Sequence, residues 1–298
     1  MIAILWAWLM ACSFVVSGMM THYASPLAAT GLRFLLALAL MTPFYMANRS
    51  HHSMPLKTLC QSPVTLLHYA LISGSLVGFF VGLFTALKTT TSLNTSVMYT
   101  LVPLLAAMLA MIFGVRTSTK QWLGYILGAG GAVTVLLVTR GGKLEWHIGD
   151  MIYLGACGLL AFHVISVQLW GGGVSAIEGA YRILLFGVLW LVPIVVIWGE
   201  LSQVQWQAQR FWLLLLFLTV FATLLTFVLQ QLVIKFAGAK RLLGMSYTIP
   251  IWVSCYQATQ QLDLALFSAG FTIGSIMVIL ALLMIDSTSN REKVAVNG

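Results

Sequence analysis

Ionisable side chains are rare within the apolar stretches of this sequence, so the few that occur there are the first candidates for chemistry. Glu178, Arg182, Arg33 and His163 stand in long apolar runs, where a charged group costs free energy unless it is paired or hydrated. Ser175 precedes Glu178 by three residues, the spacing of a helix-capping box. Arg182 follows Glu178 by four, the spacing of an ion pair on one helix face. We therefore favour capping and structural pairing for Glu178 over proton or substrate handling.

Arg33 and His163 have no such local partner in the sequence. Arg33 lies one or two turns inside its apolar run, where its long side chain can reach the outer membrane interface. His163 lies midway along another run and is the remaining group that could titrate near the middle of a membrane. For His163 we favour a hydrogen-bonded packing role over a proton carrier.

A second set of candidates surrounds two prolines in related stretches. Lys88–Pro103 reads KTTTSLNTSVMYTLVP and Lys235–Pro250 reads KFAGAKRLLGMSYTIP, an offset of about 147 residues. A proline cannot donate to the carbonyl four residues before it, so the backbone oxygens of Tyr99 and Ser246 are expected to be free. Such groups are tolerated in a bilayer where protein or water satisfies them. We expect these two helices to form the floor and roof of an internal cavity.

Uncharged polar side chains gather on and near the two proline helices, which suits a neutral or zwitterionic metabolite better than a polyanion. The predicted substrate-binding residues are Tyr99, Thr100, Ser246, Tyr247, Thr248, His163 and Gln257. Structural or gating roles are predicted for Pro103, Pro250, Arg33, Arg182 and Glu178. Further hydrogen-bond partners could come from Ser13, Ser17, Gln168, Gln230, Gln231 and Tyr256.

The composition is that of a polytopic membrane protein. Of 298 residues, 60% are hydrophobic and 7% are charged, against roughly 25% charged in soluble domains. The net charge of +8 comes from basic residues in short loops, where membrane orientation explains them better than nucleic acid does. Ten apolar segments of roughly the length that a bilayer requires run approximately over 2–20, 26–47, 64–87, 93–114, 121–139, 149–170, 175–198, 211–234, 241–261 and 265–285.

Orientation follows from the lysines and arginines of the loops. With a cytoplasmic N-terminus, nine lie inside and four outside, so both termini are predicted to be cytoplasmic in a cell inner membrane. The inner set is Arg49, Lys57, Arg116, Lys120, Lys235, Lys240, Arg241, Arg291 and Lys293, and the outer set is Lys88, Arg140, Lys143 and Arg210. We interpret the loop that carries His51 and His52 as a solvated linker and not as a metal site.

The two halves of the chain are related in sequence. GLRFLLALALMTP around Arg33 matches AYRILLFGVLWLVP around Arg182, at an offset of about 149. Five helices per half is an odd number, so the halves have opposite orientations, as in secondary transporters with the substrate near the midplane. We predict an all-α fold of ten transmembrane helices as a 5+5 inverted repeat, with repeats at 1–143 and 144–286 and a short polar, disordered cytoplasmic tail at 287–298.

The runs GFFVGLFTALKTTTSLNTSVMYTLVPLLAAML and QWLGYILGAGGAVTVLL, after an arginine early in the second helix, resemble an EamA domain of the drug/metabolite transporter superfamily. The second half resembles it more weakly. The resemblance implies a ten-helix exporter of small metabolites, often amino acids, working by alternating access. Many EamA repeats carry a glutamate where this chain has Val115 and Gln261, so no role of that acid is carried over.

Small residues predict where helices approach closely. Gly74, Gly78 and Gly82 recur every four residues on the third segment and make a flat face for another helix. Their counterparts on the eighth segment are bulky, so the halves are not expected to line a cavity identically. For the pairs Gly124/Gly128 and Gly270/Gly274 we favour contact within the chain over a homodimer seam.

These features favour a transporter of a small polar metabolite, such as an amino acid. A lipid flippase of the same fold is the alternative, and an intramembrane enzyme or sensor is disfavoured because HExxH, GxSxG and paired intramembrane acids are lacking. The four cysteines lack CxxC spacing, so we predict no disulfide, no metal site and no cofactor. The expected partners are the substrate and the bilayer.

Overall fold

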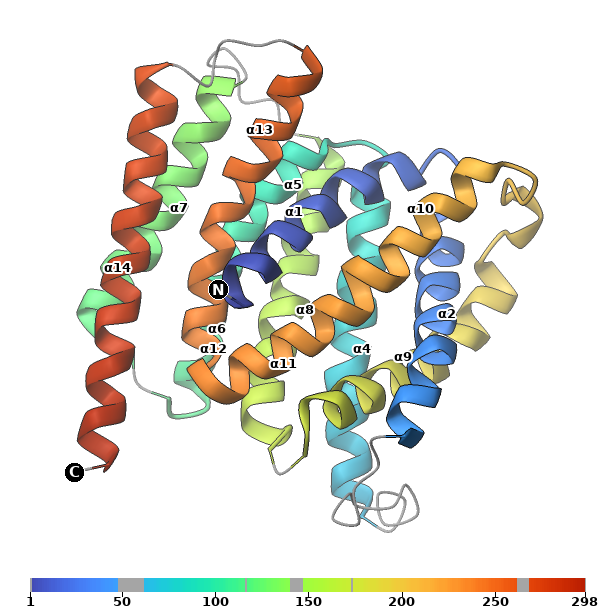
Figure 1. Ribbon diagram of the computed structural model, residues 1–298, viewed down its shortest axis with the longest axis horizontal. Helices are drawn as coiled ribbons and strands as arrows, with labels where there is room; N and C mark the ends of the chain where they lie inside the picture. Colours follow the sequence, from blue (N-terminus) through green and yellow to red (C-terminus); the bar gives the residue numbers. More distant parts are fainter. Residues whose placement is uncertain are drawn as a thin grey trace.

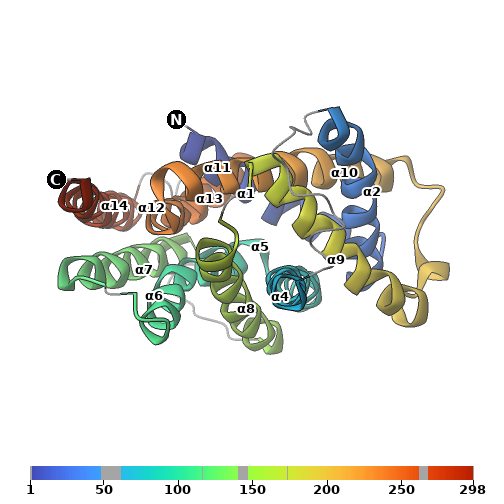
Figure 2. The ribbon, with the colours of Figure 1, turned by 90° about the horizontal axis from the view of Figure 1, so that it is seen from below.

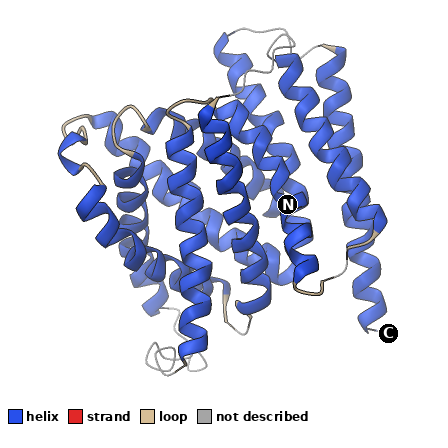
Figure 3. Cartoon of the chain, turned by 180° about the vertical axis from the view of Figure 1, so that it is seen from behind, coloured by secondary structure: helices blue, strands red, loops and turns tan. Residues whose placement is uncertain are grey.

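The computed structural model describes residues 2–47, 62–115, 117–139, 147–172, 174–261 and 268–297. Within these ranges the regular elements are helices and there is no strand (Figure 1, Figure 3). Among the described residues, eight helices are long and apolar enough to cross a membrane. They are α1 (Ile2–Met20), α2 (Pro26–Ala47), α4 (Pro63–Ala86), Ser92–Ile112, Thr119–Val138 of α7 (Thr119–Thr139), α8 (Ile148–Trp170), α9 (Ala176–Trp198) and Gln209–Ala237.

The last two predicted segments are also helical, but they are not among the eight candidate spans of the described residues. Residues 239–261 divide into α12 (Ala239–Met245), η4 (Ser246–Thr248) and α13 (Ile249–Gln261). The final helix, α14 (Ala269–Asn297), is apolar over Ala269–Ile285. The all-helical membrane fold is therefore confirmed with eight candidate spans, while the ten-helix inverted repeat stays a prediction.

The helix α14 continues through residues that were expected to form a disordered tail. Its backbone is helical to Asn297, so that expectation is wrong. The segment after Asp286 contains Arg, Glu, Lys and Ala, which favour helix. Other sequence-based interpretations lie outside the described residues: those for Arg49, His51, His52, Lys57, Cys60, Arg116, Arg140 and Lys143.

Both proline helices tighten by one turn directly before the proline. Between α5 (Ser92–Met98) and α6 (Val102–Ile112) the turn η1 (Tyr99–Leu101) is 3₁₀, and η4 has the same place before Pro250. The N–H of Val102 donates to the oxygen of Tyr99, and that of Ile249 to the oxygen of Ser246. The prediction of free carbonyls is therefore wrong, because a 3₁₀ bond spans three residues and its donor precedes the proline.

The glycines of α4 pack as the sequence predicted. A Cβ on Gly82 would lie 2.7 Å from the Cβ of Ala156, and one on Gly78 would lie 2.7 Å from Cδ1 of Leu159. Both neighbours belong to α8, which runs beside α4 in Figure 2. Gly74 instead faces the indole nitrogen of Trp190 on α9 at 3.2 Å. The small-residue face therefore lets two long helices approach closely.

A second glycine contact joins α7 to α14, which lie side by side at one edge of the molecule (Figure 1, Figure 2). A Cβ on Gly131 would lie 2.8 Å from the oxygen of Gly274, and a Cβ on Gly274 would lie 2.8 Å from that of Gly131. Gly124 faces Ile285, and Gly270 faces Val138. The favoured use of these glycines, contact within the chain, is confirmed.

The eighth span changes its winding in the middle. It consists of α10 (Gln209–Thr219), the π-helical segment η3 (Val220–Leu225) and α11 (Thr226–Ala237), after the short 3₁₀ turn η2 (Leu201–Gln203). Figure 1 shows this span as one long diagonal that passes close to α2 at its upper end. A π segment leaves backbone groups out of the usual helical pattern, and here one of them meets a side chain of α2.

Candidate functional site

The largest of three described cavities lies where α1, the turn between α4 and α5, and α13 come together. It measures about 610 Å³, within the range of small-molecule sites. We call it the Lys88 cavity. Its polar lining comes from Thr21, His22, Lys88, Thr90, Thr91, Ser92, Tyr256 and Gln257.

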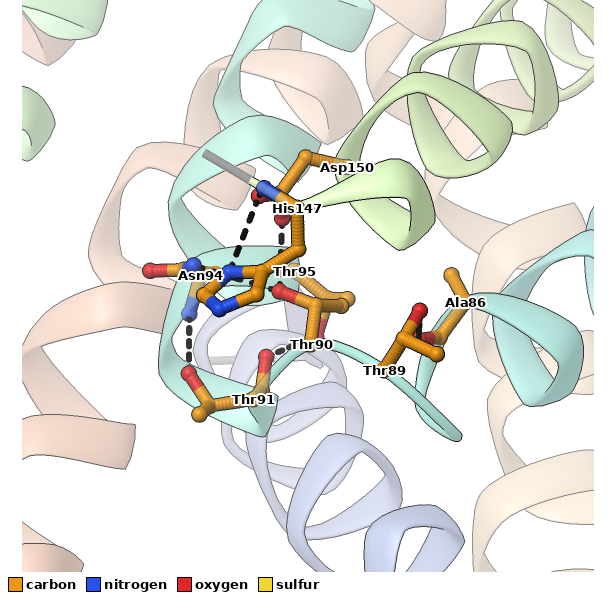
Figure 4. Close-up of polar contacts among 8 residues, drawn as sticks. All are labelled: Ala86, Thr89, Thr90, Thr91, Asn94, Thr95, His147 and Asp150. Atoms are coloured by element: carbon orange, nitrogen blue, oxygen red, sulfur yellow. Dashed lines mark hydrogen bonds and ion pairs between the residues drawn. The ribbon is translucent and has the colours of Figure 1, made fainter. Parts of the chain in front are cut away.

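The turn that carries half of this lining is fixed to α8 by a buried carboxylate (Figure 4). The hydroxyl of Thr90 donates to Oδ1 of Asp150 at 2.6 Å, and the side-chain amide of Asn94 donates to the Thr90 hydroxyl at 3.1 Å. Oδ2 of Asp150 accepts from the backbone N–H of His147 at 2.7 Å. With 1% of its surface exposed, Asp150 reaches the cavity indirectly, by positioning Thr90.

The same turn is held against α1 on its other side. The hydroxyl of Ser92 donates to the backbone oxygen of Phe14 at 3.1 Å. Gly18 makes this approach geometrically feasible, because a Cβ there would lie 2.6 Å from the Ser92 hydroxyl. Gly18 and Ser92 both line the Lys88 cavity, so this part of its wall is formed where the Ser92 side chain meets the backbone of α1.

Asp150 was not among the residues predicted from the sequence, although it lies within the apolar segment 149–170. Asp150 lies in the first turn of α8, which begins at Ile148, and it forms a capping box with His147. The spacing of His147 and Asp150 before an apolar run was the available signal. The hydrogen bond between Asp150 and Thr90, which lies 60 residues earlier in the chain, had no signal in the sequence.

The predicted residues next to the two prolines have other partners, and of these Tyr99, Thr100, Ser246 and Tyr247 are buried while Thr248 is half-buried. Hydroxyls donate to backbone oxygens of the preceding turn: Thr100 to Val97 at 2.5 Å, Ser246 to Leu243 at 2.6 Å and Thr248 to Met245 at 2.8 Å. The Tyr247 hydroxyl donates to the oxygen of Tyr125 at 3.0 Å. Tyr99 packs edge-on against Phe14, with ring centroids 5.3 Å apart. Of the predicted substrate-binding residues, Gln257 alone lines one of the three cavities.

His163 is engaged through both ring nitrogens. Nδ1 lies 2.8 Å from the backbone oxygen of Ile72, and Nε2 lies 3.2 Å from the amide nitrogen of Gln230. A carbonyl can only accept, so Nδ1 carries the proton and Nε2 accepts from Gln230 in a neutral ring. This arrangement supports the packing role that we favoured for His163.

Glu178 and Arg182 form the predicted pair. The Ser175 hydroxyl accepts from the N–H of Glu178 at 3.2 Å, and Arg182 donates to Oε1 of Glu178 through Nη2. Nη1 of Arg182 lies 3.4 Å from the hydroxyl of Tyr69 on α4. Both members of the pair are buried, and the contact between Arg182 and Tyr69 holds the start of α9 against α4.

Arg33 does not reach the membrane interface, contrary to the prediction. The residue is completely buried, and its guanidinium group donates through Nε to the Thr223 hydroxyl and through Nη2 to the oxygen of Ala222. The guanidinium carbon lies 4.3 Å from the ring centre of Phe80. The π winding of η3 brings these acceptors to α2, and no local sequence pattern indicated it.

The two other cavities differ in character. One of about 400 Å³ is lined mainly by apolar side chains, among them Trp8, Phe217 and Trp252, and shares Val15, Met19 and Tyr256 with the Lys88 cavity. The other, near Ala110 and Lys240, measures about 20 Å³, close to the space of a single water. Polar space is therefore concentrated at the end of the molecule that carries Lys88. Among the described residues, no group of three His, Cys, Asp or Glu side chains could hold a metal ion.

Eight helices of the described residues are long and apolar enough to cross a membrane, which indicates a multi-pass membrane protein. Residues 1–137 match the model of the EamA-like transporter family, so the resemblance inferred from the sequence is confirmed over these residues. The members of this family are transporters and not enzymes.

One solved structure, described as "Crystal structure of protein", has the same fold as this chain. The TM-score is 0.72 and the alignment covers 97% of this chain and 98% of that one, at 16% sequence identity. No curated protein sequence matches the chain. The shared fold therefore covers both halves of the chain.

Proposed function

We propose that this chain is a secondary transporter that exports a small polar metabolite, such as an amino acid or a related compound, across the inner membrane by alternating access. The observation that carries the proposal is the Lys88 cavity, because residues distant in the sequence, from α1, the α4–α5 turn and α13, enclose it together. The contrast between about 610 Å³ at this end and about 20 Å³ near Lys240 supports a state open to one side.

The proposed architecture is ten helices in a 5+5 inverted repeat with both termini in the cytoplasm. It is supported by the match between the Arg33 and Arg182 stretches and by the helical course of the last two segments. Reporters fused after Thr117 and after Gly298 should both give cytoplasmic signals. A periplasmic signal from either fusion contradicts this topology.

The chemistry of the lining favours a substrate with a carboxylate and other hydrogen-bonding groups. Lys88 and His22 are exposed to the cavity, and its lining within the described part of the chain contains no carboxylate. A lysine binds a carboxylate as a point charge, and Gln257 together with the hydroxyls of Thr91 and Ser92 can bind amine or hydroxyl groups. A substrate site next to the two prolines stays a second prediction, since none of the three cavities is lined by Tyr99, Thr100, Ser246, Tyr247 or Thr248.

The proposal is tested by transport. Cells with and without the protein are screened for accumulation of and resistance to amino acids and related metabolites, and each hit is measured in proteoliposomes. Gln257→Ala should raise KM about threefold to tenfold, the effect of one lost hydrogen bond. Gln209→Ala is the matched control, because Gln209 is exposed at the start of α10 and does not line the cavity. Equal KM values in both variants would move the site away from the Lys88 cavity.

A further inference from the structure

Arg33 is a buried cation without a counter-charge. No carboxylate pairs with its guanidinium group within the described part of the chain, and Nη1 is buried without a hydrogen-bond partner. Nε and Nη2 have the neutral acceptors Thr223 and Ala222, and Phe80 covers the plane of the group. Removing a guanidinium group from water costs several kcal/mol, and neutral acceptors offset part of that cost.

The corresponding arginine in the second half has the partner that Arg33 lacks. Arg182 pairs with Glu178, four residues earlier on the same helix. Four residues before Arg33 the chain has Ala29, which is also buried. One helix therefore supplies a carboxylate to its arginine, and the other leaves the matching position to a methyl group.

The π segment η3 fixes the orientation of the arginine. The oxygen of Ala222 accepts from Nη2, and the Thr223 hydroxyl accepts from Nε while it donates to the oxygen of Leu218 at 2.8 Å. Two of the three guanidinium nitrogens are thus held by one turn of the eighth span. The third, Nη1, is left with two N–H groups and no acceptor.

We propose that Nη1 of Arg33 forms a binding site for a small anion, either a free halide or the carboxylate group of a small organic acid. An anion there supplies the charge that Glu178 supplies to Arg182, and it accepts the two unused N–H groups. Nη1 is completely buried and Arg33 lines none of the three cavities described above, so an anion binds there only if the packed side chains around Nη1 shift, and it has to be small. This site does not depend on the proposed transport function.

The test is thermal unfolding of the purified full-length protein in detergent at constant ionic strength. Three samples are compared, which contain sodium chloride, sodium formate or sodium gluconate. Gluconate is the control, because it is too large for the site. A ligand that binds the folded state raises its stability, so chloride or formate should raise Tm by about 3 °C or more relative to gluconate. Protection by chloride identifies a free ion as ligand, and protection by formate alone identifies a carboxylate group.

Two variants make the test specific to Arg33. Ala29→Glu places a carboxylate four residues before the arginine, as in the Glu178–Arg182 pair, and should abolish the difference between the salts. Arg33→Gln keeps a hydrogen-bonding side chain, removes the charge and should abolish it as well. Equal Tm values of the wild-type protein in all three salts overturn the proposal, and this result needs neither variant to fold. The same is true if the salt difference persists unchanged in Ala29→Glu.

Discussion

Glu178 and Arg182 lie one helical turn apart on α9 and form a buried ion pair, with 6% and 3% of their side-chain surfaces exposed. The backbone N–H of Glu178 also donates to the hydroxyl of Ser175, the N-cap of α9, so Glu178 takes part in the cap and also neutralises an arginine. Arg182 in turn contacts Tyr69 on α4. The pair therefore connects the start of α9 with a helix from the first half of the chain.

We predict that Glu178→Gln impairs folding more than it changes the proton dependence of transport. Removing one partner of a buried pair leaves the other charge uncompensated, at a cost of about 3–5 kcal/mol. Expression level and Tm should fall, while the pH profile of residual transport keeps its shape. A variant with normal expression and Tm that loses only its proton dependence would assign Glu178 to coupling.

A second prediction concerns Thr90 and Asp150, whose side chains are 2.6 Å apart at the edge of the Lys88 cavity. Thr90→Val and Asp150→Asn should each lower Tm, and the double variant should lose less than the sum of the two. The expected coupling free energy is about 1–3 kcal/mol, as for groups in direct contact. Each single variant should also raise KM, because the α4–α5 turn loses its support on α8. Additive losses in Tm would show that this bond does not stabilise the turn.

A third prediction uses two glycines that differ in their surroundings. Gly82→Ala would place a Cβ 2.7 Å from that of Ala156, whereas Gly155, the neighbour of Ala156 on α8, has no atom within 4 Å of a Cβ. We expect Gly82→Ala to destabilise the protein by about 1–3 kcal/mol through overpacking. Gly155→Ala should be neutral or stabilising, since alanine favours helix. Thermal unfolding compares the two, and Ala156→Gly should rescue Gly82→Ala.

Local patterns in the sequence were sufficient for contacts within a helix or along one helix face. The Ser175, Glu178 and Arg182 contacts follow from spacings of three and four residues, and the glycine face of α4 follows from a repeat of four. The eight spans follow from hydropathy alone. Each of these features depends on residues of a single helix, so the spacing of those residues in the sequence is enough to predict it.

The features that could not be predicted depend on residues far apart in the sequence. Arg33 contacts Thr223, 190 residues later, and only the π winding of η3 brings that hydroxyl to α2. The 3₁₀ turn before Pro103 depends on a choice between two backbone patterns that the proline alone does not determine. Proline lacks the N–H that would donate to the carbonyl oxygen four residues before it. The sequence does not determine whether that oxygen stays free or accepts from a residue three positions away.

The last prediction concerns Tyr247, which the sequence placed at the substrate and the structure places against α7. Its ring lies over Gly128, where an added Cβ would come within 2.7 Å of Cε1, and its hydroxyl donates to the oxygen of Tyr125 at 3.0 Å. Tyr247→Phe keeps the ring contact and removes this bond. We therefore expect a loss of about 1 kcal/mol in the free energy of unfolding and a KM within twofold of the wild-type value. The measurements are thermal unfolding and transport at subsaturating substrate, with Tyr256→Phe as the matched variant because Tyr256 lines the Lys88 cavity. If Tyr247→Phe raised KM with an unchanged Tm, its hydroxyl would bind the substrate, and the site would lie on the proline helices after all.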